Sequence, residues 1–203
     1  MSSPLDTAQG TFAAMLPEHL PAIEAATQAL GFAMASDRAT GTLLRTLAAS
    51  KPGGRLLELG TGTGAGAAWL LQGMDAGARL LSLDNDPAVQ AFAASLLGSD
   101  PRLTLLAEDG DEVLPRLAAA GERFDLIFAD AWPGKYRLLE VALGLLPPGG
   151  IYVVDDLLPQ PNWPPNHGER VAGLVDTLRA RPDLWIAQLE WSTGLLVAVK
   201  RTA

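Results

Sequence analysis

Acidic residues follow several hydrophobic segments of the chain, where their carboxylates could bind the polar groups of one ligand. Glu58 precedes the glycine run GTGTGAG, and Asp84, Asp109 and Asp130 each end an apolar stretch. A carboxylate at the end of a strand can accept hydrogen bonds from both hydroxyls of a ribose, or can bind an amino group. Any one of them alone would more often cap a turn, but four successive strand ends with such residues indicate a binding site.

The glycine run is itself a candidate ligand loop. Gly60, Gly62 and Gly64 allow the backbone to turn sharply and to approach a ligand closely. The helix expected after the loop presents free amide groups at its N-terminus, which suit a polar or negatively charged group. The spacing of Gly62, Gly64 and Ala67 also approximates the G-x-G-x-x-A pattern of dinucleotide-binding loops. An NAD-linked oxidoreductase is therefore an alternative, although Glu58 would lie unfavourably beside a pyrophosphate.

Strand-like and helical patterns alternate five times along the chain and predict a parallel sheet with helices on both faces. The short turn WST between the last two strands allows only an antiparallel pair. The predicted fold is therefore α/β and doubly wound, with a mostly parallel sheet of seven strands that ends in an antiparallel hairpin. A helix-capping pair, Ser36–Asp37, begins the second of two extra N-terminal helices. The expected strands are 55–59, 78–84, 103–109, 124–130, 150–156, 184–190 and 194–200, and the expected helices are 18–30, 37–49, 67–74, 87–98, 111–120, 135–146 and 168–180.

Composition narrows the classes of function. The 203 residues suit one domain, with an N-terminal helical part (1–50) and a sheet-containing core (51–203). A net charge of −8 argues against nonspecific binding to nucleic acid or to an anionic membrane surface. The absence of cysteine excludes disulfides, thiolate metal sites and a cysteine nucleophile. No apolar run approaches the ~20 residues of a membrane span, and the first ten residues lack the pattern of a secretory signal, so we expect a cytoplasmic protein.

Four segments carry a family resemblance. Residues 58–64, ELGTGTG, fit the E-x-G-x-G-x-G loop of class I S-adenosylmethionine-dependent methyltransferases. FAMASDRATG (32–41) resembles W-A-M-x-x-G-D-x-K-G of the catechol O-methyltransferase type, and DAWPGKY (130–136) resembles D-H-W-K-D-R-Y of the same type. PPGGIYVVDDLL (147–158) is similar to the strand that ends in Asp-Asn in that family. The resemblance covers about residues 32 to 157.

The resemblance implies a Rossmann-like methyltransferase fold and methyl transfer from S-adenosylmethionine to an oxygen of a small phenolic or catechol-like acceptor. In this family Glu58 and Gly60 would lie by the methionine part of the cofactor, and Asp84 would hold the ribose. Asp109 and Gly110 would meet the adenine, and Trp132 would pack against it, unless Trp132 is a plug that covers the end of the sheet. The full set of implied cofactor-binding residues is Met34, Glu58, Gly60, Gly62, Gly64, Gly66, Asp84, Asn85, Asp109, Gly110, Asp130 and Trp132.

A magnesium site is a further expectation. If the strands that end at Asp130 and at Asp155–Asp156 are neighbours, their ends lie ~5 Å apart and three carboxylates could converge. Such carboxylates repel one another unless they are protonated or bridged by a cation, and an oxygen-only set suits Mg²⁺. The family has an asparagine in place of Asp156, so this chain carries one more negative charge there.

The catalytic base departs from the family pattern. The family's lysine falls at Pro133, while Lys135 lies two residues on, at the first turn of the expected helix. Asp130 and Lys135 are the catalytic candidates. His167, in the proline-rich loop, is another conceivable base or a solvated surface residue. Because Pro133 replaces the lysine, a protein that binds the cofactor without methyl transfer is a second alternative.

The expected acceptor site lies under two segments. Residues 32–41 and the loop 157–168 would cover the acceptor, with Trp163 either as an aromatic wall or as a core contact that anchors the loop. The apolar N-terminal helices could also serve a homodimer, as they do in similar bacterial enzymes.

Overall fold

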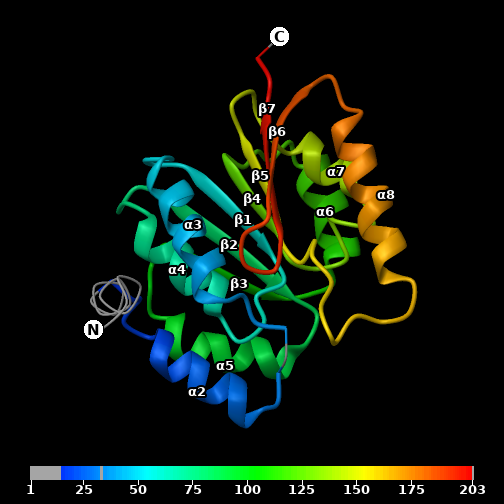
Figure 1. Ribbon diagram of the computed structural model, residues 1–203. Coiled ribbons are helices and arrows are strands. Elements are labelled where there is room, and N and C mark those ends of the chain that lie inside the picture. Colours follow the sequence, from blue (N-terminus) through cyan, green and yellow to red (C-terminus); the bar gives the residue numbers. More distant parts are fainter. Residues whose placement is uncertain (1–14, 33, 203) are drawn as a thin grey trace, which may run out of the picture.

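The computed structural model describes residues 15–32 and 34–202 (Figure 1). The first ten residues, whose composition argued against a secretory signal, lie outside these ranges, and so does Ala33 of the segment 32–41. Within the described part, the chain forms one seven-stranded sheet between two layers of helices. This arrangement is the predicted fold class.

The sheet has the strand order β3-β2-β1-β4-β5-β7-β6. Strands β1 to β5 pair in parallel, and β7 pairs antiparallel to both β5 and β6. The predicted hairpin at the end of the chain is therefore confirmed. The strands are β1 Arg55–Leu59, β2 Arg79–Asp84, β3 Leu103–Ala107, β4 Leu126–Ala129, β5 Ile151–Val154, β6 Leu184–Leu189 and β7 Leu195–Lys200.

The register brings the carboxyl ends of the parallel strands to one edge of the sheet. Leu59, the last residue of β1, lies beside Leu83 of β2 and Ala129 of β4. On the next strand, Ala129 pairs with Val154. Because β1 is central, the residues that follow it lie between those that follow β2 and those that follow β4. Ligands of parallel α/β sheets bind at this edge.

Helices cover both faces of the sheet (Figure 1). Buried residues of α2, α3, α4 and α5 pack on one face, with Trp69 as the largest side chain. Buried residues of α6, α7 and α8 pack on the other, against Tyr152 and Phe124. The helices are α2 Leu20–Ala29, α3 Arg38–Ala49, α4 Ala65–Gly73, α5 Pro87–Leu97, α6 Gly110–Ala119, α7 Leu139–Gly144 and α8 His167–Arg179.

Helix termini follow the local sequence signals. Asp37 caps α3, and its side chain accepts a hydrogen bond from the Thr40 amide at 2.8 Å. Pro87 occupies the first turn of α5, as predicted. The predicted strand 103–109 ends at Ala107 instead, because Asp109 serves as the N-cap of α6 and its carboxylate accepts from the Asp111 amide at 2.9 Å.

The predicted helix 135–146 is wrong in its first half. Residues 132–138 form a tight turn, in which the Trp132 carbonyl accepts the amides of Lys135, Tyr136 and Arg137 at 3.2, 2.9 and 3.0 Å. Gly134 and Leu138 adopt left-handed backbone angles, φ 81° and 55°. Such angles interrupt a right-handed helix, so α7 begins only at Leu139 and Lys135 lies in the turn before it.

Candidate active site

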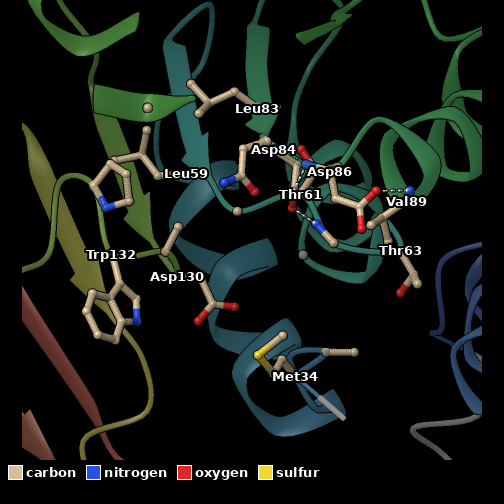
Figure 2. A pocket seen from close by; sticks show the side chains of 18 of the residues that line it. Met34, Leu59, Thr61, Thr63, Leu83, Asp84, Asp86, Val89, Asp130 and Trp132 are labelled. Carbon is tan, nitrogen blue, oxygen red and sulfur yellow. Dashed lines mark hydrogen bonds between the residues drawn. The ribbon is translucent and has the colours of Figure 1, made fainter. Parts of the chain in front are cut away.

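A cavity of about 470 Å³ opens at the carboxyl ends of β1, β2 and β4 (Figure 2). Its size suits a small-molecule site. In Figure 2, Asp130 and Trp132 lie on one side of the cavity, Asp84 and Thr61 on another, and Met34 faces them from the segment before α3. The cavity brings together ten of the twelve predicted cofactor residues: Met34, Gly60, Gly62, Gly66, Asp84, Asn85, Asp109, Gly110, Asp130 and Trp132.

The loop between β1 and α4 is fixed against its neighbouring strands. The amides of Gly60 and Thr61 both donate to the Leu83 carbonyl, at 2.9 and 3.1 Å. Gly60 has φ +100°, and a Cβ there would lie 2.8 Å from the Asp130 carbonyl oxygen. Only glycine combines this backbone angle with such a close approach. The loop therefore lies directly against the chain that leaves β4.

Asp84 holds the loop from the other side. Its Oδ2 accepts a hydrogen bond from the Gly62 amide at 2.8 Å, and its Oδ1 accepts from the Asp86 amide at 3.0 Å. A carboxylate has about four acceptor positions, so each oxygen can accept one more hydrogen bond. Because Asp84 lines the cavity, it could bind two adjacent hydroxyl groups while it holds the loop.

Glu58 does not line the cavity, although the sequence assigned it to the cofactor. Its side chain is fully buried beneath the loop, where Ser82 donates a hydrogen bond to Oε2. Its Oε1 lies so close to Gly66 that a Cβ on this residue would be 2.2 Å away. Gly64 also lies outside the cavity lining, and a Cβ at this position would contact Leu97. Burial raises the pKa of Glu58 to about 8, although the hydrogen bond from Ser82 opposes this.

This raised pKa predicts a pH-dependent effect of the substitution Glu58→Gln. The folded state holds a proton that the unfolded chain releases near its ordinary pKa of 4.5. The wild type therefore loses stability as the pH rises from about 4.5 to about 8. Glutamine keeps the shape without the titration. The quantity to compare is the free energy of unfolding of Glu58→Gln minus that of wild type at the same pH. We expect this difference to increase by a few kcal/mol between pH 5 and pH 9, because each unit of pKa shift corresponds to about 1.4 kcal/mol.

Urea unfolding at several pH values measures this difference. Glu190→Gln is a control at an exposed glutamate, and its free energy of unfolding should follow that of the wild type. A difference between Glu58→Gln and wild type that stays constant from pH 5 to pH 9 would contradict the buried, protonated Glu58.

A second cavity of about 400 Å³ adjoins the first. The two share residues 34–36 and 130–132, which form a common wall. Residues of the segment 32–41 thus line both cavities, and residues of the loop 157–168 line the second. The second cavity is further lined by Lys135, Tyr136, Asp155, Asp156, Gln160, Pro161, Asn162, His167 and Thr193.

Aromatic side chains form one side of the second cavity. Trp132 is 41% exposed and contacts Tyr136 edge to face, with ring centroids 5.9 Å apart. This exposure does not fit a plug that seals the end of the sheet. The guanidinium of Arg170 lies 5.2 Å from the centre of the Trp132 ring. Arg170 thus lies over one face of the Trp132 ring.

His167 is not a solvated loop residue. It is the first residue of α8, is 5% exposed, and lies 4.7 Å from Trp163 between ring centroids. Its Nε2 is 3.2 Å from the Tyr136 hydroxyl. Burial lowers the pKa of His167, which the carboxylate of Asp156 partly offsets. Trp163 packs against the hydrophobic core and also donates its indole N–H to Asp156, so it anchors the loop.

Four ionisable side chains line the second cavity: Asp130, Asp155, Asp156 and Lys135. Lys135 is only 4% exposed, and its Nζ donates to the Asp155 carbonyl oxygen at 2.6 Å. Asp130 Oδ2 accepts from the Ser36 hydroxyl at 3.1 Å. Asp155 Oδ1 accepts from the Thr193 hydroxyl and from the Asp156 amide.

The electrostatics of this group are strongly coupled. Burial and the charge of Asp155 raise the pKa of Asp130 to about 8, while Lys135 opposes the shift. Burial lowers the pKa of Lys135, while the three carboxylates oppose that shift.

The predicted magnesium ligands do not form a cation site as they are arranged. Both oxygens of Asp156 lie 2.9 Å from the indole nitrogen of Trp163, which turns this carboxylate toward the loop. In residues 15–32 and 34–202, no three acidic or histidine side chains have the geometry to hold a metal ion. The strands β4 and β5 are neighbours, as the prediction required, but the side chains that follow them are bound to protein groups.

Several residues that line the first cavity were not among the predicted cofactor contacts: Thr61, Thr63, Asp86, Val89 and Arg137, together with Phe32 and Ser36 of the segment predicted to cover the acceptor. Thr61 and Thr63 alternate with the glycines of the loop, and this alternation could have indicated from the sequence that they line the cavity. Arg137 reaches the cavity through the turn that replaced the predicted helix, and no sequence pattern indicated it.

Comparison with known proteins assigns this site to a family. A family model described as a methyltransferase domain matches residues 57–157. Residues 57–157 are a methyltransferase domain. This match covers β1 to the segment after β5, and thus the glycine loop, Asp84 and Asp130. It decides against the NAD-linked oxidoreductase that the glycine spacing had left open.

Relatives of the methyltransferase domain carry O-methyltransferase names. A proposed O-methyltransferase from Mycobacterium avium (strain 104) is 38% identical over 122 residues, which are 57% of this chain and 54% of that protein. A counterpart from Mycolicibacterium paratuberculosis is also 38% identical over 122 residues. The chain thus spans about half the length of these relatives.

Solved structures share the fold of the methyltransferase domain over most of the chain. The O-methyltransferase TomG from Streptomyces achromogenes, in complex with S-adenosylmethionine, matches with a TM-score of 0.82, 24% identity and 100% coverage of both chains. The O-methyltransferase from Bacillus cereus, in complex with S-adenosylhomocysteine, matches with a TM-score of 0.78, 21% identity and 90% coverage of both chains.

Among the described residues, no helix has the length and apolar character to cross a membrane.

Proposed function

We propose that the protein transfers the methyl group of S-adenosylmethionine to an oxygen of a small aromatic acceptor. The observation that carries this proposal is the pair of adjoining cavities, which share Asp130 and Trp132. One cavity lies on the glycine loop of the methyltransferase domain, and the other lies among aromatic side chains. Such a pair suits a reaction that brings a methyl donor and an acceptor together.

The first cavity contains groups that would bind an adenosyl sulfonium. Asp84 would accept the two ribose hydroxyls with its remaining acceptor positions. Asp109, Gly110 and Trp132 line the same cavity and would lie near the adenine. When bound, S-adenosylmethionine would supply an electrophilic methyl group.

In the second cavity, Asp130 and Lys135 are the proposed catalytic residues. Asp130 lines both cavities, so its carboxylate would lie near an acceptor hydroxyl and could take up its proton. The raised pKa of Asp130 makes its ionised form a stronger base than an ordinary carboxylate. Lys135 also lines the second cavity, and its ammonium group would stabilise negative charge on the acceptor oxygen.

A transfer assay tests this function. The protein is incubated with S-adenosylmethionine labelled on its methyl group and with a panel of phenols, catechols and their singly methylated derivatives. We expect label to enter at least one acceptor, and we expect Asp130→Asn to lower the rate about 10² to 10³-fold. Cofactor binding without transfer to any acceptor would favour the alternative of a scaffold that has lost its chemistry, which Pro133 at the base position first suggested.

A homodimer through the N-terminal helices is also part of this proposal. In the described residues α2 packs on α4 and buries Leu20 and Ile23, while Leu30 after its end is exposed. Size-exclusion chromatography with light scattering measures the oligomeric state: a dimer is expected, and a monomer at micromolar concentration would contradict it.

A further inference from the structure

We propose that Arg170 selects acceptors that carry a carboxylate group apart from the hydroxyl that receives the methyl group. Its guanidinium would bind this carboxylate at the edge of the second cavity. The inference rests on the proposed function, because it concerns the acceptor of the same reaction. Arg170 lies outside residues 57–157, which match the methyltransferase domain, so the family match assigns it no role.

The first argument is the position of Arg170. It lies three residues after His167 in α8, so the two side chains are on the same side of this helix. His167, Tyr136 and Trp132 all line the second cavity. The guanidinium carbon of Arg170 lies 5.2 Å from the centre of the Trp132 ring. Its positive charge also acts on the side chains of Tyr136 and His167. The guanidinium is therefore at the edge of the aromatic side of this cavity.

The second argument is that this guanidinium has no acidic partner. Arg170 is exposed, and no ion pair in the part of the chain that the structure describes includes it. Arg137, which lines the first cavity, is by contrast paired with Asp111 at 2.7 Å. A guanidinium presents its N–H donors in a planar fork that matches the two oxygens of a carboxylate. Contact with the Trp132 ring also restricts the Arg170 side chain, which lowers the entropy cost of fixing it when a ligand binds.

The third argument is the contrast between two parts of the cavity. Asp155 is 3% exposed, and Asp130 and Asp156 line the cavity with it. Lys135 is 4% exposed and already donates to the Asp155 carbonyl oxygen at 2.6 Å. A carboxylate of the acceptor would be repelled by these acids and would lose its water there. At the exposed Arg170 it would meet a positive charge and stay hydrated. The acceptor would therefore bind with its hydroxyl toward Asp130 and its carboxylate toward Arg170.

The experiment measures the binding of probe acceptors in the absence of any methyl donor. The probes are para-hydroxybenzoate and para-hydroxycinnamate, and each is compared with its neutral amide. Ligand-observed nuclear magnetic resonance gives the dissociation constants, both with and without S-adenosylhomocysteine. We expect wild type to bind at least one of the two carboxylates about tenfold more tightly than its amide, which corresponds to about 1.4 kcal/mol.

Two substitutions at Arg170 and one control variant assign this preference to its guanidinium. Arg170→Gln should remove the preference by weakening the carboxylate probes alone, and Arg170→Lys, which keeps the charge, should retain part of it. Arg201→Gln is the matched control, because the Arg201 guanidinium also contacts an aromatic ring, that of Trp185 at 4.3 Å. Arg201 follows β7, whose end lies beside the beginning of β5 and thus at the opposite edge of the sheet from the cavity. This variant should keep the wild-type preference.

Three results would overturn the inference. The first is wild type that binds no carboxylate probe more tightly than its amide, and the second is an Arg170→Gln variant that keeps the preference. The third is an equal loss of affinity for carboxylates and amides in Arg170→Gln, because Arg170 would then only pack on Trp132. None of these measurements depends on methyl transfer. Transfer to phenols without a preference for carboxylates would keep the proposed function and contradict this inference, whereas the preference without any transfer would do the reverse.

Discussion

Replacing Asp84 with alanine is expected to weaken the binding of S-adenosylhomocysteine about 100-fold or more. Asp84 would accept two hydroxyl hydrogen bonds, and each hydrogen bond to a charged group contributes about 1.5–3 kcal/mol. The substitution also removes the acceptors of the Gly62 and Asp86 amides, which hold the loop against β2. Asp84→Asn keeps one acceptor oxygen and should lose less affinity.

Isothermal titration calorimetry measures this loss, with Asp75→Ala as the matched control. Asp75 also accepts backbone amides, those of Gly53, Gly77 and Ala78, but it lies before β2, at the opposite end of this strand from Asp84. Its replacement should leave the affinity for S-adenosylhomocysteine within about twofold of wild type. Equal affinity in Asp84→Ala and wild type would remove Asp84 from the site.

The substitution Gly60→Ala is expected to be the most damaging change in the glycine loop. A side chain at φ +100° is strained by about 1–3 kcal/mol. Its Cβ would also lie 2.8 Å from the Asp130 carbonyl oxygen, and this neighbour is backbone that cannot rotate away. We expect a loss of about 2–4 kcal/mol in the free energy of unfolding, together with loss of cofactor binding, because the loop must move away from β4.

The substitution Gly121→Ala separates the effect of backbone strain on stability from the effect of steric contact. Gly121 also has a positive φ, +71°, but a Cβ there would meet no atom within 4 Å. It should lose only about 1 kcal/mol and should keep the affinity for S-adenosylhomocysteine. Urea unfolding and calorimetry on both variants make the comparison. Equal losses for the two glycines would show that the contact of Gly60 with Asp130 has no effect.

The sheet could be predicted from the sequence because each buried strand is a short apolar run that ends at a glycine or an acid. The same runs placed Gly60, Asp84 and Asp130 at one edge, since parallel strands that are neighbours end together. The antiparallel hairpin of the last two strands could be predicted from the short turn between them. These features depend on local sequence patterns and on the rule that neighbouring parallel strands end at the same edge of the sheet.

The turn 132–138 could not be predicted in the same way. Its conformation depends on Leu59 and Tyr152, which lie on two other strands and contact Gly134. The sequence therefore left the direction of Lys135 open. Burial of Glu58 and His167 likewise depends on packing between elements far apart in the chain, which no local pattern reports.

The central claim is that the cavity on the glycine loop binds an adenosyl sulfonium. Titration of the wild-type protein with S-adenosylhomocysteine, in a calorimeter and with NAD as the comparison ligand, tests it most directly. The expected result is one site with a micromolar dissociation constant for S-adenosylhomocysteine and no measurable heat with NAD. Tight binding of NAD, or no binding of S-adenosylhomocysteine by the folded protein, would contradict the claim.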